Sequence, residues 1–157
     1  MKETFQIIPA SSGPIWFFVG LATFFLALLT LFGYLAYSSR HLKFEVSPEG
    51  LRISGDLYGR QIPLKSLILD RAKRVDLNRD KDYQLKRRTN GTGLPGYRAG
   101  WFKLRNGEKC LVFVTDKRRV LYLPTRQGYS VLLSVKEPDS LLDALREAAS
   151  RDAAMSG

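Results

Sequence analysis

The sequence predicts a mainly β domain, a small barrel or sandwich closed by a C-terminal helix, that follows one transmembrane helix. Three observations carry this prediction. Residues 15–37 contain no charged side chain, although 25% of the 157 residues are charged. The runs after them alternate between apolar and polar residues with a period of two, which is typical of β-strands. Only the last segment, from Pro138, has apolar residues at helical spacing.

The uncharged segment, residues 15–37, has the length of a membrane-spanning helix. At about 1.5 Å per residue it would extend roughly 34 Å, which exceeds the hydrocarbon core of about 30 Å. Trp16 lies at one end and Tyr34 and Tyr37 lie at the other, where interfacial aromatic residues are enriched. Because its apolar residues surround the helix on every side, a domain this small could not bury it, and a transmembrane anchor is favoured.

A cleaved signal peptide is the alternative, since small residues at positions 36, 38 and 39 resemble a cleavage site. Signal peptides, however, have an apolar core of roughly 7–15 residues behind a basic start. Here the apolar run is longer, and the short leader over residues 1–14 holds only Lys2 and Glu3 as charged residues. The sequence therefore predicts an uncleaved, single-pass anchor.

The distribution of Lys and Arg predicts the orientation of this anchor. Lys2 alone precedes the segment, whereas Arg40, Lys43 and Arg52 follow it closely. By the positive-inside rule, the following domain lies on the cytoplasmic side of the cell inner membrane. The whole net charge of +10 belongs to that domain, which would face anionic lipid. Cys110 is the only cysteine, so no intrachain disulfide is available and a buried apolar role is expected for it.

The segment after the anchor, residues 42–150, is predicted to contain seven to nine short strands. Residues 42–46 and 51–54 alternate around the turn Ser47-Pro48-Glu49-Gly50 and form a predicted hairpin. Asn106-Gly107 indicates a second hairpin with a type I′ turn. The other predicted strands cover residues 60–64, 72–77, 83–88, 97–105, 108–115, 119–123 and 129–135.

One amphipathic helix is predicted to close the domain. Pro138 and Asp139 are typical of a first helical turn. The apolar stripe that would face the sheet consists of Leu141, Leu142, Leu145, Ala148 and Ala149. Residues 151–157 are predicted to form a frayed tail.

A glycine-rich segment carries a resemblance to a known family. It comprises Asn90, Gly91, Thr92, Gly93, Leu94, Pro95, Gly96 and Tyr97, and it is followed by Trp101-Phe102, the Asn106-Gly107 hairpin and Tyr122-Leu123-Pro124-Thr125. Together these motifs resemble the bacterial pleckstrin-homology-like (PH-like) domain family over about residues 42–146. The resemblance implies a partly open barrel of about seven strands with a C-terminal helix, often membrane-anchored, that acts as a binding or scaffolding module. It names no ligand, and the mixed charges of the first hairpin do not favour phosphoinositide binding.

The same glycines raise the alternative of a phosphate-binding loop, because successive backbone amides can line an anion site. Their spacing fits neither a Walker loop nor a dinucleotide-binding fingerprint, and a strand rather than a helix is predicted after them. A structural loop is therefore favoured. Asn90-Gly91-Thr92 also matches a glycosylation sequon, which a cytoplasmic domain would not use.

Basic residues are the candidate binding groups. The predicted contacts to an anionic lipid surface or a protein partner are Lys86, Arg87, Arg88, Arg98, Lys117, Arg118 and Arg119. A solvated surface would have a similar composition. Nucleic acid is a third partner for the same charges, given a sequence pI near 9.9 and several aromatic residues, but no recognition helix, zinc motif or RNP motif accompanies them.

No catalytic, metal or cofactor site is predicted. His41 is the only histidine and lies where the anchor ends, the serines lack a Gly-x-Ser-x-Gly motif, and ion pairing is expected for Asp70, Asp76, Asp80 and Asp82. The sequence thus predicts a non-enzymatic, membrane-anchored binding module. The alternative is a structural subunit that assembles through its transmembrane helix, where Gly20, Ala22, Ala27 and Gly33 would allow close helix approach, although no Gly-x-x-x-Gly pair is present.

Overall fold

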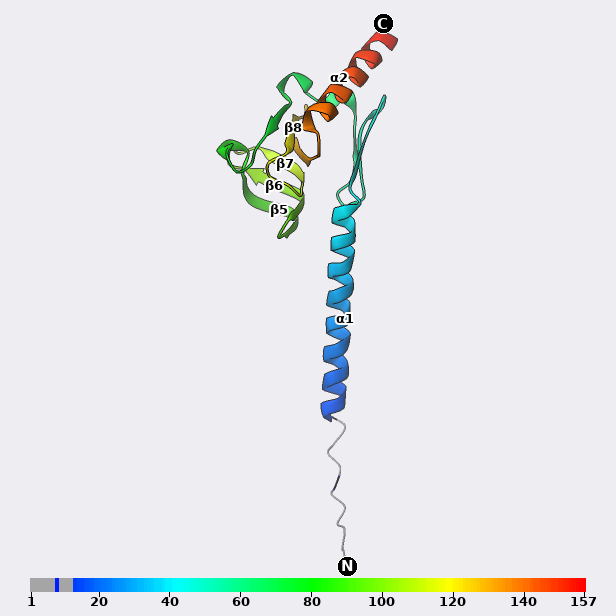
Figure 1. Ribbon diagram of the computed structural model, residues 1–157, viewed down its shortest axis with the longest axis vertical. Helices are drawn as coiled ribbons and strands as arrows, with labels where there is room; N and C mark the ends of the chain where they lie inside the picture. Colours follow the sequence, from blue (N-terminus) through cyan, green and yellow to red (C-terminus); the bar gives the residue numbers. More distant parts are fainter. Residues whose placement is uncertain (1–7, 9–12) are drawn as a thin grey trace, which may run out of the picture. The chain divides into compact units, whose positions relative to one another are not determined.

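The computed structural model describes Ile8 and residues 13–157. It divides into two compact units, Met1–Ser38 and Ser39–Gly157. The first unit contains most of helix α1 (Gly13–Arg40), drawn in blue in Figure 1. Apart from Ile8, Gly13 and Pro14, the leader predicted over residues 1–14 lies outside the described residues.

Helix α1 is long and apolar enough over Gly13–Tyr37 to cross a membrane. At about 1.5 Å per residue, this stretch extends roughly 37 Å. Most of its large apolar side chains are exposed, among them Phe17 at 67% and Leu29 at 68%. Compared with the predicted segment over residues 15–37, α1 begins two residues earlier, at Gly13, and ends three residues later, at Arg40.

The second unit opens with a small antiparallel sheet of three strands. Its strands are β1 (Lys43–Ser47), β2 (Gly50–Ser54) and β3 (Gln61–Ile62), in the order β1-β2-β3. The predicted first hairpin is confirmed, because Ser47 pairs with Gly50 across the turn and Lys43 pairs with Ser54 at the other end. Two short 3₁₀ turns, η1 (Leu64–Ser66) and η2 (Leu69–Arg71), lead out of this sheet.

The larger sheet has six strands in the order β4-β8-β9-β7-β6-β5. Its strands are β4 (Lys73–Val75), β5 (Leu85–Leu94), β6 (Tyr97–Leu104), β7 (Lys109–Val114), β8 (Val120–Pro124) and β9 (Ser130–Ser134). All neighbours are antiparallel except β7 and β9, because β9 inserts between β7 and β8 and runs parallel to β7. Helix α2 (Pro138–Met155), orange to red in Figure 1, completes the unit.

One face of the six-stranded sheet carries the main core. Side chains that alternate along its strands, such as Phe113 and Leu133, pack with Leu51 and Ile53 of the small sheet and with Leu145 of α2. The Leu and Ala stripe predicted for the C-terminal helix therefore does face the sheet. Burial of Cys110 on the opposite face, with no exposed surface, confirms its predicted apolar environment. This burial also raises the pKa of its thiol well above the usual range.

A strap formed by residues 76–84 crosses that opposite face. It connects β4 at one edge of the sheet to β5 at the other. Leu77 is buried there and donates its backbone N–H to Lys117 O at 2.8 Å, and Tyr83 packs on the ring of Tyr122. At the other end, Arg105 N–H donates to Gln84 O at 2.9 Å. The strap thus covers a second core that would otherwise face water.

The strap also corrects the ion pairing expected of the aspartates within it. Within the described residues, none of the four aspartates for which ion pairing was expected, Asp70, Asp76, Asp80 and Asp82, takes part in an ion pair. Asp76 Oδ1 instead accepts the N–H of Asn78 at 2.9 Å, and Asp80 Oδ2 accepts the N–H of Asp76 at 2.8 Å. These carboxylates stabilise the turn of the strap, as Asp side chains commonly do.

Three further predictions are corrected. β5 continues to Leu94, so the glycine-rich segment is mainly strand and turn rather than loop. At Asn106-Gly107 only the glycine has positive φ, so the turn is not type I′. The backbone N–H of Gly107 instead donates to Leu104 O, which closes a three-residue hairpin connection. Connections of this kind need glycine at their last position. Helix α2 reaches Met155, which leaves only Ser156 and Gly157 beyond it.

Because the second unit has its own two cores, we expect it to fold without α1. A fragment covering residues 39–157 should be soluble, give a circular dichroism spectrum dominated by β-structure, and unfold cooperatively in urea. A fragment that ends at residue 150 should be less stable, because it cuts the last helical turns. Loss of cooperative unfolding in the longer fragment would contradict two self-contained cores.

Candidate functional site: a cationic end of the domain

The chain enters the second unit at one end of the domain, which we call the entry end. There residues 41–43 lead into β1, and the backbone oxygen of His41 lies beside Gly55. The next residue, Asp56, accepts a hydrogen bond from the Tyr97 hydroxyl at the start of β6. The β5–β6 turn and the β7–β8 loop are therefore at the entry end. The β6–β7 and β8–β9 turns lie at the opposite, distal end.

A glycine pair explains why the glycine-rich segment has its composition. Gly91 of β5 pairs directly with Gly100 of β6. A Cβ on Gly100 would lie 2.5 Å from the Cα of Gly91, and Gly100 has a φ of +114°. Both conditions exclude a side chain, so these glycines permit close approach of two backbones. The structural reading of the segment is thus favoured over a phosphate-binding loop.

Gly100→Ala should therefore destabilise the domain by about 2 kcal/mol or more, from positive φ and backbone overlap together. Urea unfolding of the fragment over residues 39–157 measures this loss. Gly93→Ala is the matched control, because the nearest atom to a Cβ there is a flexible arginine nitrogen at 3.7 Å. Equal stability of the two variants would contradict the role of the glycine pair.

Some of the predicted cations come together at the entry end. A cavity of about 380 Å³ is lined by Gly93–Arg98 together with Val114, Thr115 and Lys117. Arg98 and Lys117 also line a smaller cavity beneath the strap. Arg88 Nη1 lies 3.7 Å from the position of a Cβ on Gly93, so its guanidinium reaches the same place from β5. Arg118 and Arg119 continue the same β7–β8 loop and are exposed.

The structure separates the other two predicted cations from this group. Lys86 and Arg87 are exposed at the start of β5, and Arg87 pairs with Lys103 near the distal end. Bulges at positions 86 and 89 interrupt the pairing of β5 with β6 on either side of Arg88. Of these three consecutive basic residues, Arg88 is the one whose guanidinium lies beside Gly93. We call Arg88, Arg98, Lys117, Arg118 and Arg119 the cationic cluster.

None of the ion pairs among the described residues involves the cationic cluster, although Asp116 lies in the same loop and accepts the backbone N–H of Arg118 at 2.9 Å. In the part of the chain that the structure describes, the three ion pairs join Lys65 to Asp152, Arg74 to Asp139, and Arg151 to Glu147. The cationic cluster can form charge-assisted hydrogen bonds with phosphate or carboxylate groups. Within residues 13–157, no group of three or more His, Cys, Asp or Glu side chains could hold a metal ion.

Asp56 supplies a titratable group at the same end. Burial raises the pKa of its carboxyl, and backbone N–H groups of Leu57 and Tyr58 oppose this effect. Because the folded-state pKa is raised, the folded domain holds this proton more tightly than the unfolded chain does. The contribution of Asp56 to stability is therefore largest below pH 3.8 and decreases as the pH rises through the folded-state pKa.

Asp56→Asn should remove the pH-dependent contribution of this carboxyl to the stability of the domain. We expect the variant to be at least as stable as the wild type at neutral pH, because an amide still accepts the Tyr97 hydroxyl without burying a charge. The difference in the free energy of unfolding should shrink as the pH falls toward 4, since the wild-type carboxyl then becomes neutral. Urea titrations of both proteins between neutral pH and pH 4 measure this difference in the free energy of unfolding. A difference that grows as the pH falls would contradict a raised pKa for Asp56.

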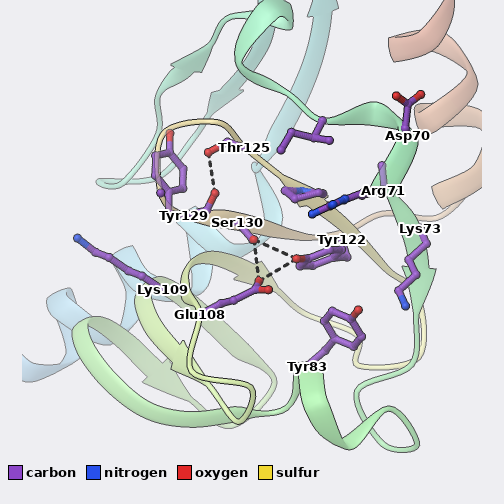
Figure 2. A pocket seen from close by; sticks show the side chains of 14 residues that line it. Asp70, Arg71, Lys73, Tyr83, Glu108, Lys109, Tyr122, Thr125, Tyr129 and Ser130 are labelled. Carbon is purple, nitrogen blue, oxygen red and sulfur yellow. Dashed lines mark hydrogen bonds between the residues drawn. The ribbon is translucent and has the colours of Figure 1, made fainter.

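A second site was not predicted. At the distal end, a cavity of about 630 Å³ is lined by charged and hydroxyl side chains that Figure 2 shows from close by. Its residues come from η2 and β4, from the strap, from the start of β7 and from the β8–β9 turn. No short motif joins these segments, so the only sequence signal was the recurrence of tyrosine at positions 83, 122 and 129.

The fold defines a class of protein: two β-sheets closed by a C-terminal helix form a PH-like domain, a fold of binding and scaffolding modules that are typically non-catalytic. The sequence matches the bacterial PH domain family over residues 42–149. The chain belongs to that family. Neither the curated proteins nor the solved structures contain a match to this chain.

Proposed function

We propose that this protein is a membrane-tethered binding module whose cationic cluster contacts the anionic headgroups of the membrane that holds α1. The observation that carries the proposal is the location of the cluster. Arg88, Arg98 and Lys117 lie at the entry end, where the chain arrives from α1. Only residues 38–42 separate the apolar stretch of α1 from β1, so the entry end is the part of the domain that the chain reaches first after α1.

The energetics support a role in orientation more than in recruitment. Each Lys or Arg near an anionic leaflet contributes about 1 kcal/mol. Five such residues would exceed the thermal energy several times over. Because α1 already confines the domain to the surface, this energy would select which face of the domain meets the lipid. The remaining surface, including α2, would stay available to partner proteins on the cytoplasmic side.

The test uses the fragment over residues 39–157 and sedimentation with vesicles. Binding should be weak, increase when phosphatidylglycerol is added to phosphatidylcholine, and decrease as the Debye length falls from about 30 Å at low salt to about 8 Å at physiological salt. Arg88→Glu with Lys117→Glu should lower the partition coefficient about tenfold or more, because two attractions of about 1 kcal/mol become repulsions.

The matched control is Lys86→Glu with Arg87→Glu. It introduces the same charge change at two exposed positions of β5 that lie near the distal end. Both double variants should keep nearly the wild-type Tm, because exposed charges contribute little to stability. Equal losses in the two variants would show that net charge alone governs binding. Binding to an acidic protein but not to anionic vesicles would replace the lipid with a protein partner.

A further inference from the structure

The cavity at the distal end has the size of a small-molecule site. Its volume of about 630 Å³ falls within the range of roughly 300–1,000 Å³ that is usual for ligand pockets. Figure 2 shows its charged groups on two walls. One wall carries Glu108 with Tyr122 and Ser130, and the other carries Arg71 and Lys73. Lys109 and Asp70 also line the cavity, but the ammonium of Lys109 lies over the Trp101 ring, 4.5 Å from its centroid, and the Asp70 carboxylate points away from the middle of the cavity in Figure 2.

The acidic wall is held in place by buried hydroxyl groups. Tyr122 Oη donates to Glu108 Oε2 at 2.8 Å, and Ser130 Oγ lies 2.9 Å from the same oxygen. Tyr122 and Ser130 are only 6% and 5% exposed. Burial raises the pKa of Tyr122 to about 12, so its hydroxyl remains a donor at physiological pH. In the described residues, Oε1 of Glu108 accepts no hydrogen bond from another side chain and remains available to a ligand.

The basic wall consists of two cations from consecutive elements. Arg71 ends η2 and Lys73 begins β4. In Figure 2 the Arg71 side chain points toward the middle of the cavity, while the ammonium of Lys73 lies beside Tyr83, at 4.7 Å from its ring centroid. The interaction with Tyr83 raises the pKa of Lys73, which keeps this side chain protonated.

The two walls do not neutralise each other. Within the described part of the chain, Arg71, Lys73 and Glu108 belong to no ion pair. A ligand with only a negative charge would be attracted to the cations but repelled by Glu108. A ligand with only a positive charge would be attracted to Glu108 but repelled by the cations. A ligand that carries both charges would satisfy both walls.

We propose that this cavity binds a small zwitterion, in which an ammonium group is joined by a short linker to a phosphate or carboxylate. The anionic group contacts Arg71 and Lys73, and the ammonium contacts Glu108 Oε1. The hydroxyl group of Tyr83, which lies beside Lys73, can also donate to the anionic group. A free metabolite and an aminated lipid headgroup share this chemistry.

The experiment uses the full chain in phosphatidylcholine nanodiscs and isothermal titration calorimetry. Phosphoethanolamine is compared with ethyl phosphate and with ethylamine, each of which lacks one of the two charges. β-Alanine is compared with propionate in the same way. At least one zwitterion should bind about tenfold or more tightly than its singly charged analogues, since each wall adds charge-assisted hydrogen bonds.

Two substitutions assign the charges to the walls. Glu108→Gln should remove the preference for phosphoethanolamine over ethyl phosphate, while the amide oxygen can still accept from Tyr122 and Ser130. Arg71→Gln should remove the preference over ethylamine. The matched controls are Glu147→Gln and Arg74→Gln, because these side chains pair with Arg151 and Asp139 and do not line the cavity. Both controls should bind like the wild type.

The outcomes separate the proposal from its alternatives. Equal affinity for a zwitterion and its singly charged analogue, or no binding of any probe, would overturn it. So would controls that lose as much affinity as Glu108→Gln and Arg71→Gln. Repeating the titration in nanodiscs that contain phosphatidylethanolamine identifies the source. A lipid headgroup in the cavity would weaken the apparent binding of soluble phosphoethanolamine, whereas a free metabolite would leave it unchanged.

Discussion

Coverage of both faces of the six-stranded sheet is the constraint on which the rest of the domain depends. The small sheet and α2 cover one face, and the strap over residues 76–84 covers the other. Because all of β8 is buried, the sheet cannot present a flat binding surface. Polar and charged groups are therefore displaced to the ends of the strands, where turns and loops reach solvent. The cationic cluster and the distal cavity both follow from this arrangement.

The two ends then differ in chemistry because they differ in which segments meet there. At the entry end, the β7–β8 loop, which is rich in cations, lies against a glycine-rich turn, and no ion pair among the described residues involves these cations. At the distal end, acidic and basic residues face one another across a cavity lined with buried hydroxyl groups. One surface is suited to an extended anionic plane and the other to a compact ligand. In the proposed orientation, contact between the cationic cluster and the membrane would leave the cavity at the opposite end of the domain open.

Local sequence patterns predicted the helices and strands, whereas the two candidate sites depend on contacts between residues that are far apart in the sequence. The hairpin at Ser47 and Gly50, the apolar stripe of α2 and the burial of Cys110 each depend on residues close in sequence, so alternation and turn chemistry were sufficient. The position of Arg88 beside Gly93 depends on bulges in β5, which no local signal marks. The contact between Asp56 and Tyr97 joins residues 41 positions apart. The distal cavity combines four separate segments, so a motif search could not find it.

The insertion of β9 between β7 and β8 has a consequence for biosynthesis. β9 lies at the interior of the sheet, yet it is the last strand to be translated, and α2 follows it. The ribosome releases the chain from its N-terminus at about 5–20 residues per second. The apolar helix therefore emerges long before the strand that links the two halves of the sheet. Until β9 has been synthesised, β7 and β8 lack their shared neighbour and leave backbone N–H and C=O groups unpaired at their edges, so the six-stranded sheet can close only after its last strand has emerged.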